Sequence, residues 1–124
     1  MFKHPDYVMV MVSDMKRSVA FYRDLLGLPL KFESPDWTEF TTGTTTLALH
    51  GGAKPTTGQP SHEKPAGTCS IGFNVANLDE TYHALKNKGM TFVMPPTDRQ
   101  GEGIRLAVAR DPDGLSVSFA ESKR

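Results

Sequence analysis

The sequence has little of several features that mark special classes of protein. A single cysteine among 124 residues excludes an internal disulfide. Fourteen lysines and arginines balance fourteen aspartates and glutamates, and this zero formal charge argues against nucleic acid or anionic lipid as a partner. The longest uninterrupted apolar run is Tyr7 to Val12, far short of the roughly 20 residues that cross a bilayer. No apolar leader follows Met1, so we predict a cytoplasmic protein without a membrane span.

What the sequence does contain is one order of elements that occurs twice. Tyr7 to Val12 alternates as a strand does, Ser13 or Asp14 can cap a helix, and Gly27 can end that helix. Three further strands are predicted from their apolar and β-branched residues and the turn residues between them: Leu30 to Glu33, Trp37 to Thr41 and Thr45 to His50.

The same order returns in the second half of the chain. Asn77 can cap a second helix that ends at Gly89, and a shift of 63 residues places Asp14 on Asn77. The predicted strands of this half are Ser70 to Val75, Met90 to Met94, Ile104 to Ala109 and Leu115 to Ala120. The segment 95–103, with two glycines, is either a lid or an ordinary surface loop.

The length supports one compact domain, residues 1–124, built from two modules. We place the first βαβββ module at residues 1–50, a linker without apolar periodicity at 51–67, and the second module at 68–124. The predicted class is α+β. Each module leaves one face of its curved sheet without a helix, and the other module's equivalent face is the simplest cover for it.

Two segments resemble a known family. The stretch from Val12 to Leu28, VSDMKRSVAFYRDLLGL, is similar to the first helix of the vicinal oxygen chelate (VOC) superfamily of glyoxalases, bleomycin resistance proteins and extradiol dioxygenases, and Asp111-Pro112-Asp113-Gly114 resembles its last hairpin turn. The resemblance implies that two βαβββ modules with curved mixed sheets form a half-barrel pocket. It also implies a homodimer, with facing modules in one chain or exchanged between two.

The resemblance also implies where a metal ion would bind. Metal-using members carry His on the first strand and Glu on the last strand of each module, and the corresponding residues here are Tyr7, Ala48, Ser70 and Ser118. A phenol, a methyl group and two hydroxyls do not replace imidazoles and carboxylates around a divalent ion. We therefore predict no cofactor and no metal at the usual position, while a site with shifted ligands stays open.

Strand alternation selects the residues that would line the pocket. The candidate ligand-binding residues are Tyr7, Met9, Met11, Trp37, Asn74, Arg105 and Ser118. Five of them also have a structural alternative. The methionines fill a core, and the tryptophan packs against the sheet without contacting a ligand. The asparagine forms hydrogen bonds within a buried strand, and the arginine is solvated at a sheet edge. As an anion-binding residue, the arginine would hold a ligand by a two-pronged contact.

Glu39 and His50 are the candidate catalytic residues. They could form an acid/base pair or part of a displaced metal site, since His exchanges protons near neutral pH and a partly buried Glu can act as a base. Alternatively, His50 is exposed at a strand end and Glu39 faces solvent at a sheet edge.

Three functions follow from these residues. The first is a module that binds a small hydrophobic or aromatic compound without chemistry and without the usual divalent metal. The second is an enzyme, either a glyoxalase-type lyase or isomerase using Glu39 or His50, or a dioxygenase or other metal enzyme with shifted ligands. The third is an assembly or regulatory subunit with a vestigial pocket.

Overall fold

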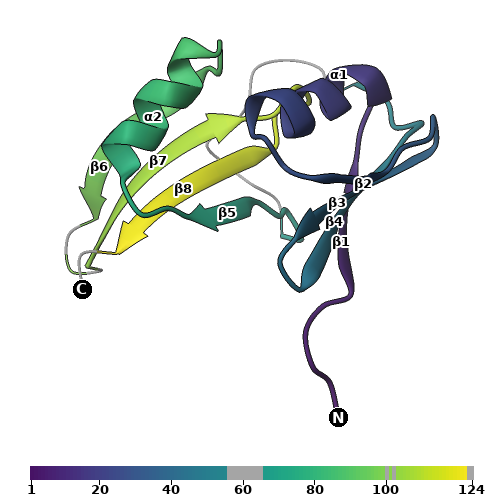
Figure 1. The fold of residues 1–124 in the computed structure, drawn as a ribbon, viewed down its shortest axis with the longest axis horizontal. Coiled ribbons are helices and arrows are strands. Elements are labelled where there is room, and N and C mark those ends of the chain that lie inside the picture. The colour runs from purple at the N-terminus through teal and green to yellow at the C-terminus, as the bar shows by residue number, and fades with distance from the viewer. Residues whose placement is uncertain (56–65, 100, 102, 123–124) are drawn as a thin grey trace. The chain divides into compact units, whose positions relative to one another are not determined.

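The computed structural model of the chain describes residues 1–55, 66–99, 101 and 103–122. It divides into two compact units, Met1–Thr57 and Gly58–Arg124, and the boundary between them lies within the predicted linker 51–67, whose residues 56–65 are outside the described residues (Figure 1). Each unit contains one mixed four-stranded sheet, which confirms the α+β class with two βαβββ modules. In the described part of the chain, no helix has the length and apolar character that crossing a membrane requires.

The first unit runs strand, helix and three strands. Its sheet has the order β1-β4-β3-β2, in which β1 is parallel to β4 and the other pairs are antiparallel. The elements are β1 (Tyr7–Met11), α1 (Met15–Val19), the π-helical turn η1 (Ala20–Leu25), β2 (Leu30–Phe32), β3 (Trp37–Thr42) and β4 (Thr45–His50).

The second unit repeats this topology. Its sheet has the order β5-β8-β7-β6, again with the first strand parallel to the last. The elements are β5 (Ile71–Asn74), α2 (Leu78–Asn87), β6 (Phe92–Arg99), β7 (Ile104–Arg110) and β8 (Ser116–Ser122).

The two helices begin in the same way. The Oδ1 atom of Asp14 accepts a hydrogen bond from the Arg17 amide at 3.1 Å, and Oδ1 of Asn77 accepts one from the Glu80 amide at 3.0 Å. The cap residues have nearly identical dihedrals, φ −139° and ψ 103° against φ −137° and ψ 102°. These side chains satisfy amides that have no partner within the helix, so the predicted repeat is present in the geometry as well as in the sequence.

The first helix differs from the single regular helix that its apolar spacing predicts. After Val19 the chain widens into the π-helical turn η1, where the Leu26 amide donates to the Phe21 carbonyl at 3.0 Å. The cap residues of the two modules are 63 positions apart, whereas the glycines that end the helices, Gly27 and Gly89, are only 62 apart. The first helical segment therefore holds one extra residue, and a π-helical turn accommodates it.

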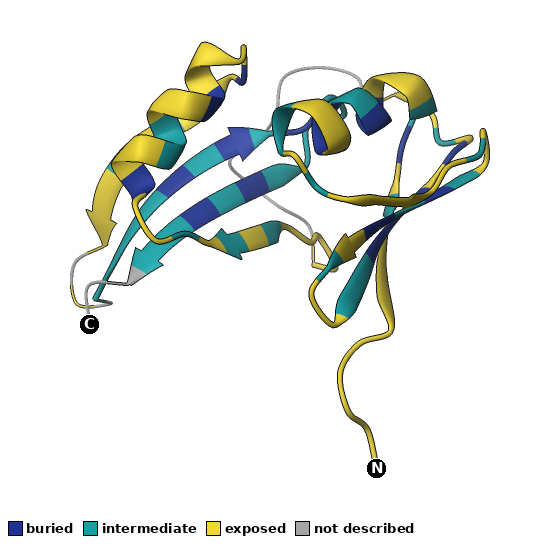
Figure 2. Cartoon of the chain, viewed as in Figure 1, coloured by how far each residue is buried: buried dark blue, intermediate teal, exposed yellow. Residues whose placement is uncertain are grey.

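Most buried apolar residues of each unit lie on its helix or on the sheet face toward that helix, and Figure 2 shows them in dark blue along these elements. In the first unit Tyr22 of η1 packs on Phe40 of β3, with ring centroids 6.0 Å apart. In the second unit Tyr82 of α2 packs on Phe92 of β6 at 4.7 Å. Figure 2 shows buried and partly buried residues alternating along β7 and β8, as expected for strands with one face under a helix.

Strand β6 is longer than predicted. It continues through Pro95 and Pro96 to Arg99, so residues 95–99 of the predicted lid or loop are a strand paired with β7, while residues 100 and 102 are outside the described residues. The pairing register shifts between Phe92 and Met94 and again between Met94 and Thr97. A proline lacks the N–H that a strand in the middle of a sheet donates, and β6 tolerates two of them because it lies at the sheet edge and bulges there.

Candidate functional site

The register of the first sheet assigns its side chains to two faces. Thr38 and Phe40 of β3 pair with Leu49 and Leu47 of β4, and all four are buried on the side that η1 covers. The opposite side, here called the open face of the first sheet, carries the intervening residues of each strand. From β1, β4 and β3 these are Tyr7, Met9, Met11, Thr46, Ala48, His50, Trp37, Glu39 and Thr41. All first-module residues that the sequence selects thus share this face.

Three of these residues form an aromatic cluster, Tyr7, Trp37 and His50. The Tyr7 and Trp37 ring centroids are 5.6 Å apart with planes at 80°, and the Trp37 and His50 centroids are 6.1 Å apart at 88°. The Trp37 indole N–H donates to Oε2 of Glu39 at 2.7 Å, which fixes the plane of the indole. The cluster therefore presents edge-to-face rings in a defined orientation on the open face.

Much of this face is apolar and accessible. Met9 and Met11 are 42% and 47% exposed to solvent, and Tyr7 is 53% exposed. Phe32 of β2, opposite Glu39, adds a ring that is 54% exposed. Sequence reasoning missed Phe32, because alternation from Leu30, which pairs with the buried Phe40, places it on the helix-covered side. A register shift between Leu30 and Phe32 brings it opposite Glu39 instead. Several large apolar side chains on one sheet face make a surface suited to an apolar partner.

Glu39 has partners on both carboxylate oxygens. Oε2 accepts the Trp37 hydrogen bond, and Oε1 lies 3.5 Å from Nζ of Lys31. In this arrangement the carboxylate orients Trp37 and pairs with a lysine, and neither oxygen is left without a neighbour. The Glu39 side chain is half-buried, so it does not face solvent at a sheet edge as the alternative interpretation expected.

His50 has one ring nitrogen engaged and one available. Nδ1 lies 2.7 Å from the Gly51 carbonyl oxygen, and because a carbonyl only accepts, Nδ1 must carry the hydrogen. In the neutral ring Nε2 then has a lone pair for a proton or a ligand. No hydrogen bond joins His50 to Glu39 within the described residues, so the predicted pair shares a face without touching.

The usual metal-binding positions hold no set of donors for a divalent ion. Ala48 lies opposite Met9 of β1, and Ser118 lies opposite Gly72 of β5, so the parallel register gives the two residues equivalent places. One is a fully buried methyl group and the other a hydroxyl. Tyr7 packs on Trp37, and Ser70 is exposed just before β5. Within the described ranges no three His, Cys, Asp or Glu side chains gather in a way that would hold a metal ion. These residues do not fit the metal of the superfamily.

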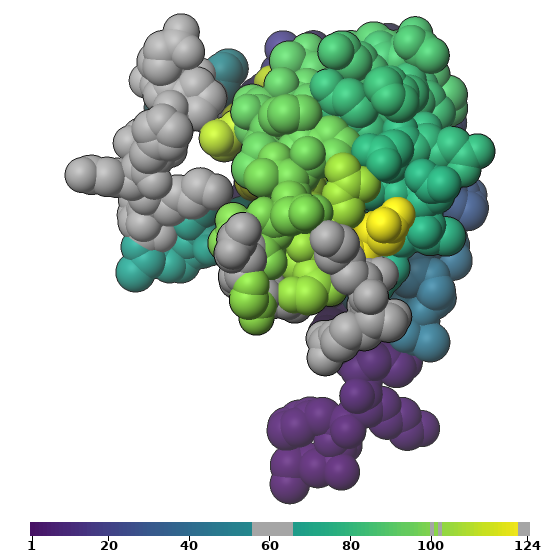
Figure 3. Space-filling model, turned by 90° about the vertical axis from the view of Figure 1, so that its left-hand side faces the viewer, coloured from purple at the N-terminus to yellow at the C-terminus, as the bar shows by residue number. Residues whose placement is uncertain are grey.

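The second sheet also has an open face, of different character. Phe119 of β8 and Ala107 of β7 are buried on the side of α2. Figure 3 shows residues of α2 and of the edge strand β6 on the outer surface of this unit. Asn74 and Ser118 lie on the other side, as predicted from alternation. The open face of the second sheet comprises small, polar and aliphatic residues: Gly72, Asn74, Leu106, Val108, Arg110, Ser116, Ser118 and Ala120.

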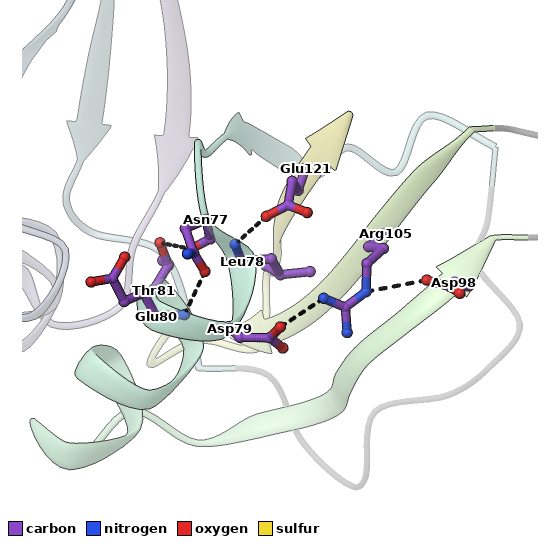
Figure 4. Close-up of polar contacts among 8 residues, drawn as sticks. All are labelled: Asn77, Leu78, Asp79, Glu80, Thr81, Asp98, Arg105 and Glu121. Carbon is purple, nitrogen blue, oxygen red and sulfur yellow. Dashed lines mark hydrogen bonds and ion pairs between the residues drawn. The ribbon is translucent and has the colours of Figure 1, made fainter. Parts of the chain in front are cut away.

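Arg105 is not on that face, so its predicted place in the pocket lining is wrong. It shares the helix-covered side with Ala107, and its guanidinium lies 2.9 Å from the Asp79 carboxylate of α2 and 3.1 Å from that of Asp98 (Figure 4). The hydrogen bond from Arg105 lowers the pKa of the Asp79 carboxyl, and Asp79 raises the pKa of Arg105. Arg105 thus ties α2 to the β6–β7 pair and lies outside the candidate site.

Arg110 is the arginine that does lie on the open face of the second sheet. It pairs with Ser116 across the hairpin, and its Nη1 donates to the Gly114 carbonyl at 3.1 Å. Sequence reasoning missed it because each face of Ile104–Arg110 combines one arginine with apolar residues. The pattern therefore did not decide which arginine faces which side.

Comparison with known proteins agrees with this architecture. The profile of the Glyoxalase/Bleomycin resistance protein/Dioxygenase superfamily matches residues 4–119. The chain is 31% identical to the uncharacterized protein YraH of Bacillus subtilis (strain 168), over 86% of this chain and 88% of that protein. It is 24% identical to a probable lactoylglutathione lyase of Synechocystis sp. (strain ATCC 27184 / PCC 6803 / Kazusa), over 94% and 93%.

Solved structures share the fold. The crystal structure of a glyoxalase family protein from Enterococcus faecalis superposes with a TM-score of 0.83 at 21% identity, covering 97% of this chain and 98% of that one. The match to the family profile extends over almost the whole length and includes both modules. The chain belongs to the glyoxalase/bleomycin resistance protein/dioxygenase superfamily.

Proposed function

We propose that this protein binds a small aromatic or hydrophobic compound on the open face of its first sheet, without the divalent metal of metal-using superfamily members. One observation carries the proposal: Trp37, oriented by Glu39, stands beside Tyr7 in the aromatic cluster, with exposed methionines on the same face. Oriented rings stack on a flat ligand, and methionine adapts to its outline. The donor chemistry of Tyr7, Ala48, Ser70 and Ser118 supports binding without a metal.

The first test measures the fluorescence of Trp37 during ligand titration. Trp37 is the single tryptophan, so its fluorescence reports the cluster directly. Titration with a panel of neutral and charged aromatic compounds should shift its emission. A ligand at 100 times its Kd should stabilise the folded state by about 2.7 kcal/mol and raise the melting temperature. Trp37→Leu should weaken binding at least about tenfold, whereas Val93→Ala, which changes an exposed apolar residue of the other unit, should not.

Two results would count against the proposal. Stoichiometric divalent metal that survives purification and a chelator, measured by elemental analysis, would contradict metal-free binding. If no compound of a broad panel moves either the fluorescence or the melting temperature, the ligand-binding proposal fails and an assembly or regulatory subunit is the better reading.

A second candidate is an enzyme of glyoxalase type, a lyase or isomerase with His50 as its base. The observation that favours it is the Nδ1 contact to the Gly51 carbonyl, which leaves Nε2 as the acceptor. The Synechocystis relative is named a probable lactoylglutathione lyase, and that reaction is the first to assay. Turnover that His50→Gln abolishes without lowering the melting temperature would support this candidate. Wild-type protein without turnover would reject it for this reaction.

A further inference from the structure

The nitrogen atoms of the aromatic cluster differ in whether they are free to bind a ligand. The Trp37 indole N–H already donates to Oε2 of Glu39 at 2.7 Å. The N–H at Nδ1 of His50 lies 2.7 Å from the Gly51 carbonyl oxygen. Both N–H groups of these two rings are therefore engaged within the first unit, and a compound that packs on the rings meets no free N–H donor on them.

The nitrogen that is left is Nε2 of His50, which is an acceptor in the neutral ring. Within the described residues no hydrogen bond reaches this atom, and His50 is exposed at the end of β4. Because Nδ1 is bound to the backbone carbonyl of the next residue, the more distal Nε2 is directed away from the backbone. The ring centroids of His50 and Trp37 are 6.1 Å apart with planes at 88°. A compound that packs against the indole therefore has this acceptor beside it.

The charges near the cluster favour a ligand without a charge of its own. Among the described open-face residues of β1, β3 and β4, Glu39 is the one acidic side chain, and its Oε1 lies 3.5 Å from Nζ of Lys31. An anionic ligand would be repelled by Glu39, and a cationic ligand would compete with Lys31 for it. Both Glu39 oxygens have partners and the side chain is only 27% exposed, so His50 is the more available acceptor.

We propose that Nε2 of His50 accepts a hydrogen bond from the ligand, so that the compound is a neutral aromatic molecule with a hydroxyl or N–H group. This inference rests on the proposed function for the packing of the ligand on Trp37, and it adds the polar group that the ligand carries. All the contacts that support it lie within the first unit. A ligand of the same shape without a donor would displace water from Nε2 and leave that atom without a hydrogen bond.

The experiment compares aromatic donors with compounds of nearly the same shape that lack the donor. Calorimetric titrations use three pairs: phenol and toluene, 2-naphthol and 2-methylnaphthalene, and indole and benzofuran. For the pairs that bind, the ratio of donor affinity to partner affinity should be at least about fivefold higher in wild-type protein than in His50→Phe, the effect of one hydrogen bond. His50→Phe keeps a ring beside Trp37 and removes only the nitrogen atoms.

The matched control is His83→Phe, the same change at an exposed histidine of α2 in the second unit. It should keep the wild-type affinity ratio for every pair. A ratio that falls equally in both variants would show that the loss does not come from the aromatic cluster, and would overturn the role of His50.

A second measurement needs no substitution and decides the case should His50→Phe not fold. NMR of wild-type protein labelled with nitrogen-15 in its histidine rings separates ring nitrogens that carry a hydrogen from those that do not. In the free protein Nε2 of His50 should be the nitrogen without hydrogen, and its signal should move when phenol is added and stay in place with toluene.

The outcomes separate this inference from the proposed function. If the aromatic compounds bind but the affinity ratios of wild-type protein and His50→Phe are equal, or if phenol binds and leaves the Nε2 signal in place, the role of His50 is wrong and the proposed function still stands. If no member of any pair binds the wild-type protein, both fail together.

Discussion

At the scale of single residues, the size of Ala48 is what allows the aromatic cluster to form. Tyr7 and Trp37 stand on β1 and β3, with β4 between them, and Ala48 is the open-face residue of β4 between Met9 and Glu39. A methyl group leaves space above β4 in which the two rings meet at 5.6 Å. The resemblance to the superfamily implies a carboxylate near this position in metal-using members, and such a side chain would compete with the rings for the same space.

The ion pair between Asp79 and Arg105 gives a prediction about pH. Because the Arg105 hydrogen bond holds the folded-state pKa of Asp79 below its ordinary value of 3.8, the pair stabilises the fold above that pH. This stabilisation is lost as the pH falls through the lower folded-state pKa. Asp79→Asn should therefore lower the urea midpoint at pH 7, and its difference from wild type should shrink below about pH 3.8.

The control for this prediction is Asp36→Asn, since the Asp36 side chain is exposed and has no hydrogen bond or ion pair in the described part of the chain. It should leave the urea midpoint nearly unchanged at both pH values. A deficit of Asp79→Asn that stays constant from pH 7 to pH 3 would show that the pair does not stabilise the fold through its charge.

At the scale of elements, each module combines a capped helix with a sheet whose first and last strands are parallel. The side-chain cap fixes where the helix begins, so the strand before it, β1 or β5, runs beside β4 or β8 in the same relative register. The extra residue of the first helical segment is taken up in η1 and does not displace β2 to β4. The modules can therefore differ in length within a helix and still keep equivalent sheet positions.

Gly51 provides a prediction about the junction after β4. A Cβ atom added at Gly51 would lie 2.7 Å from the Pro35 carbonyl oxygen. The Gly51 amide donates to the Asp36 carbonyl at 2.9 Å. The backbone before β3 thus approaches too closely for any side chain. Gly51→Ala should lower the free energy of unfolding by about 1–3 kcal/mol, measured by denaturant titration.

Gly72→Ala is the matched control, since neither glycine has a positive φ. A Cβ atom at Gly72 would meet only the Ser118 hydroxyl, at 3.1 Å, and that side chain can rotate away. We expect a change of less than about 1 kcal/mol there. Equal losses of unfolding free energy in the two variants would mean that the close backbone approach at Gly51 does not cause the destabilisation.

At the scale of the whole molecule, we propose a homodimer, as the resemblance to the superfamily implies. Strand β1 lies at an edge of the first sheet and exposes large apolar residues on both of its faces, Val8 at 46% and Met9 at 42% among them. An exposed, apolar edge strand is costly in water and is commonly covered by another chain. A second copy of this protein is the partner that family membership favours.

The prediction concerns Val8, which faces away from the aromatic cluster. Wild-type protein should sediment at twice the chain mass, and Val8→Lys should shift it toward the monomer, because a buried lysine would lose its hydration. Val93→Lys, at a residue 54% exposed on the edge strand β6, should leave the dimer intact. A wild-type protein that sediments as a monomer at micromolar concentration would reject the dimer.

The order of elements, the helix caps and the shared face of Tyr7, Met9, Met11, Trp37, Glu39 and His50 followed from the sequence, because caps, glycine stops and strand alternation depend on near neighbours. Other features were decided only by tertiary structure. The faces of Arg105 and Arg110 depend on the register of β7 against β8, and β6 extends through two prolines because it lies at a sheet edge. Such pairings join residues distant in the chain, so no local pattern encodes them, least of all in a strand with apolar residues on both faces.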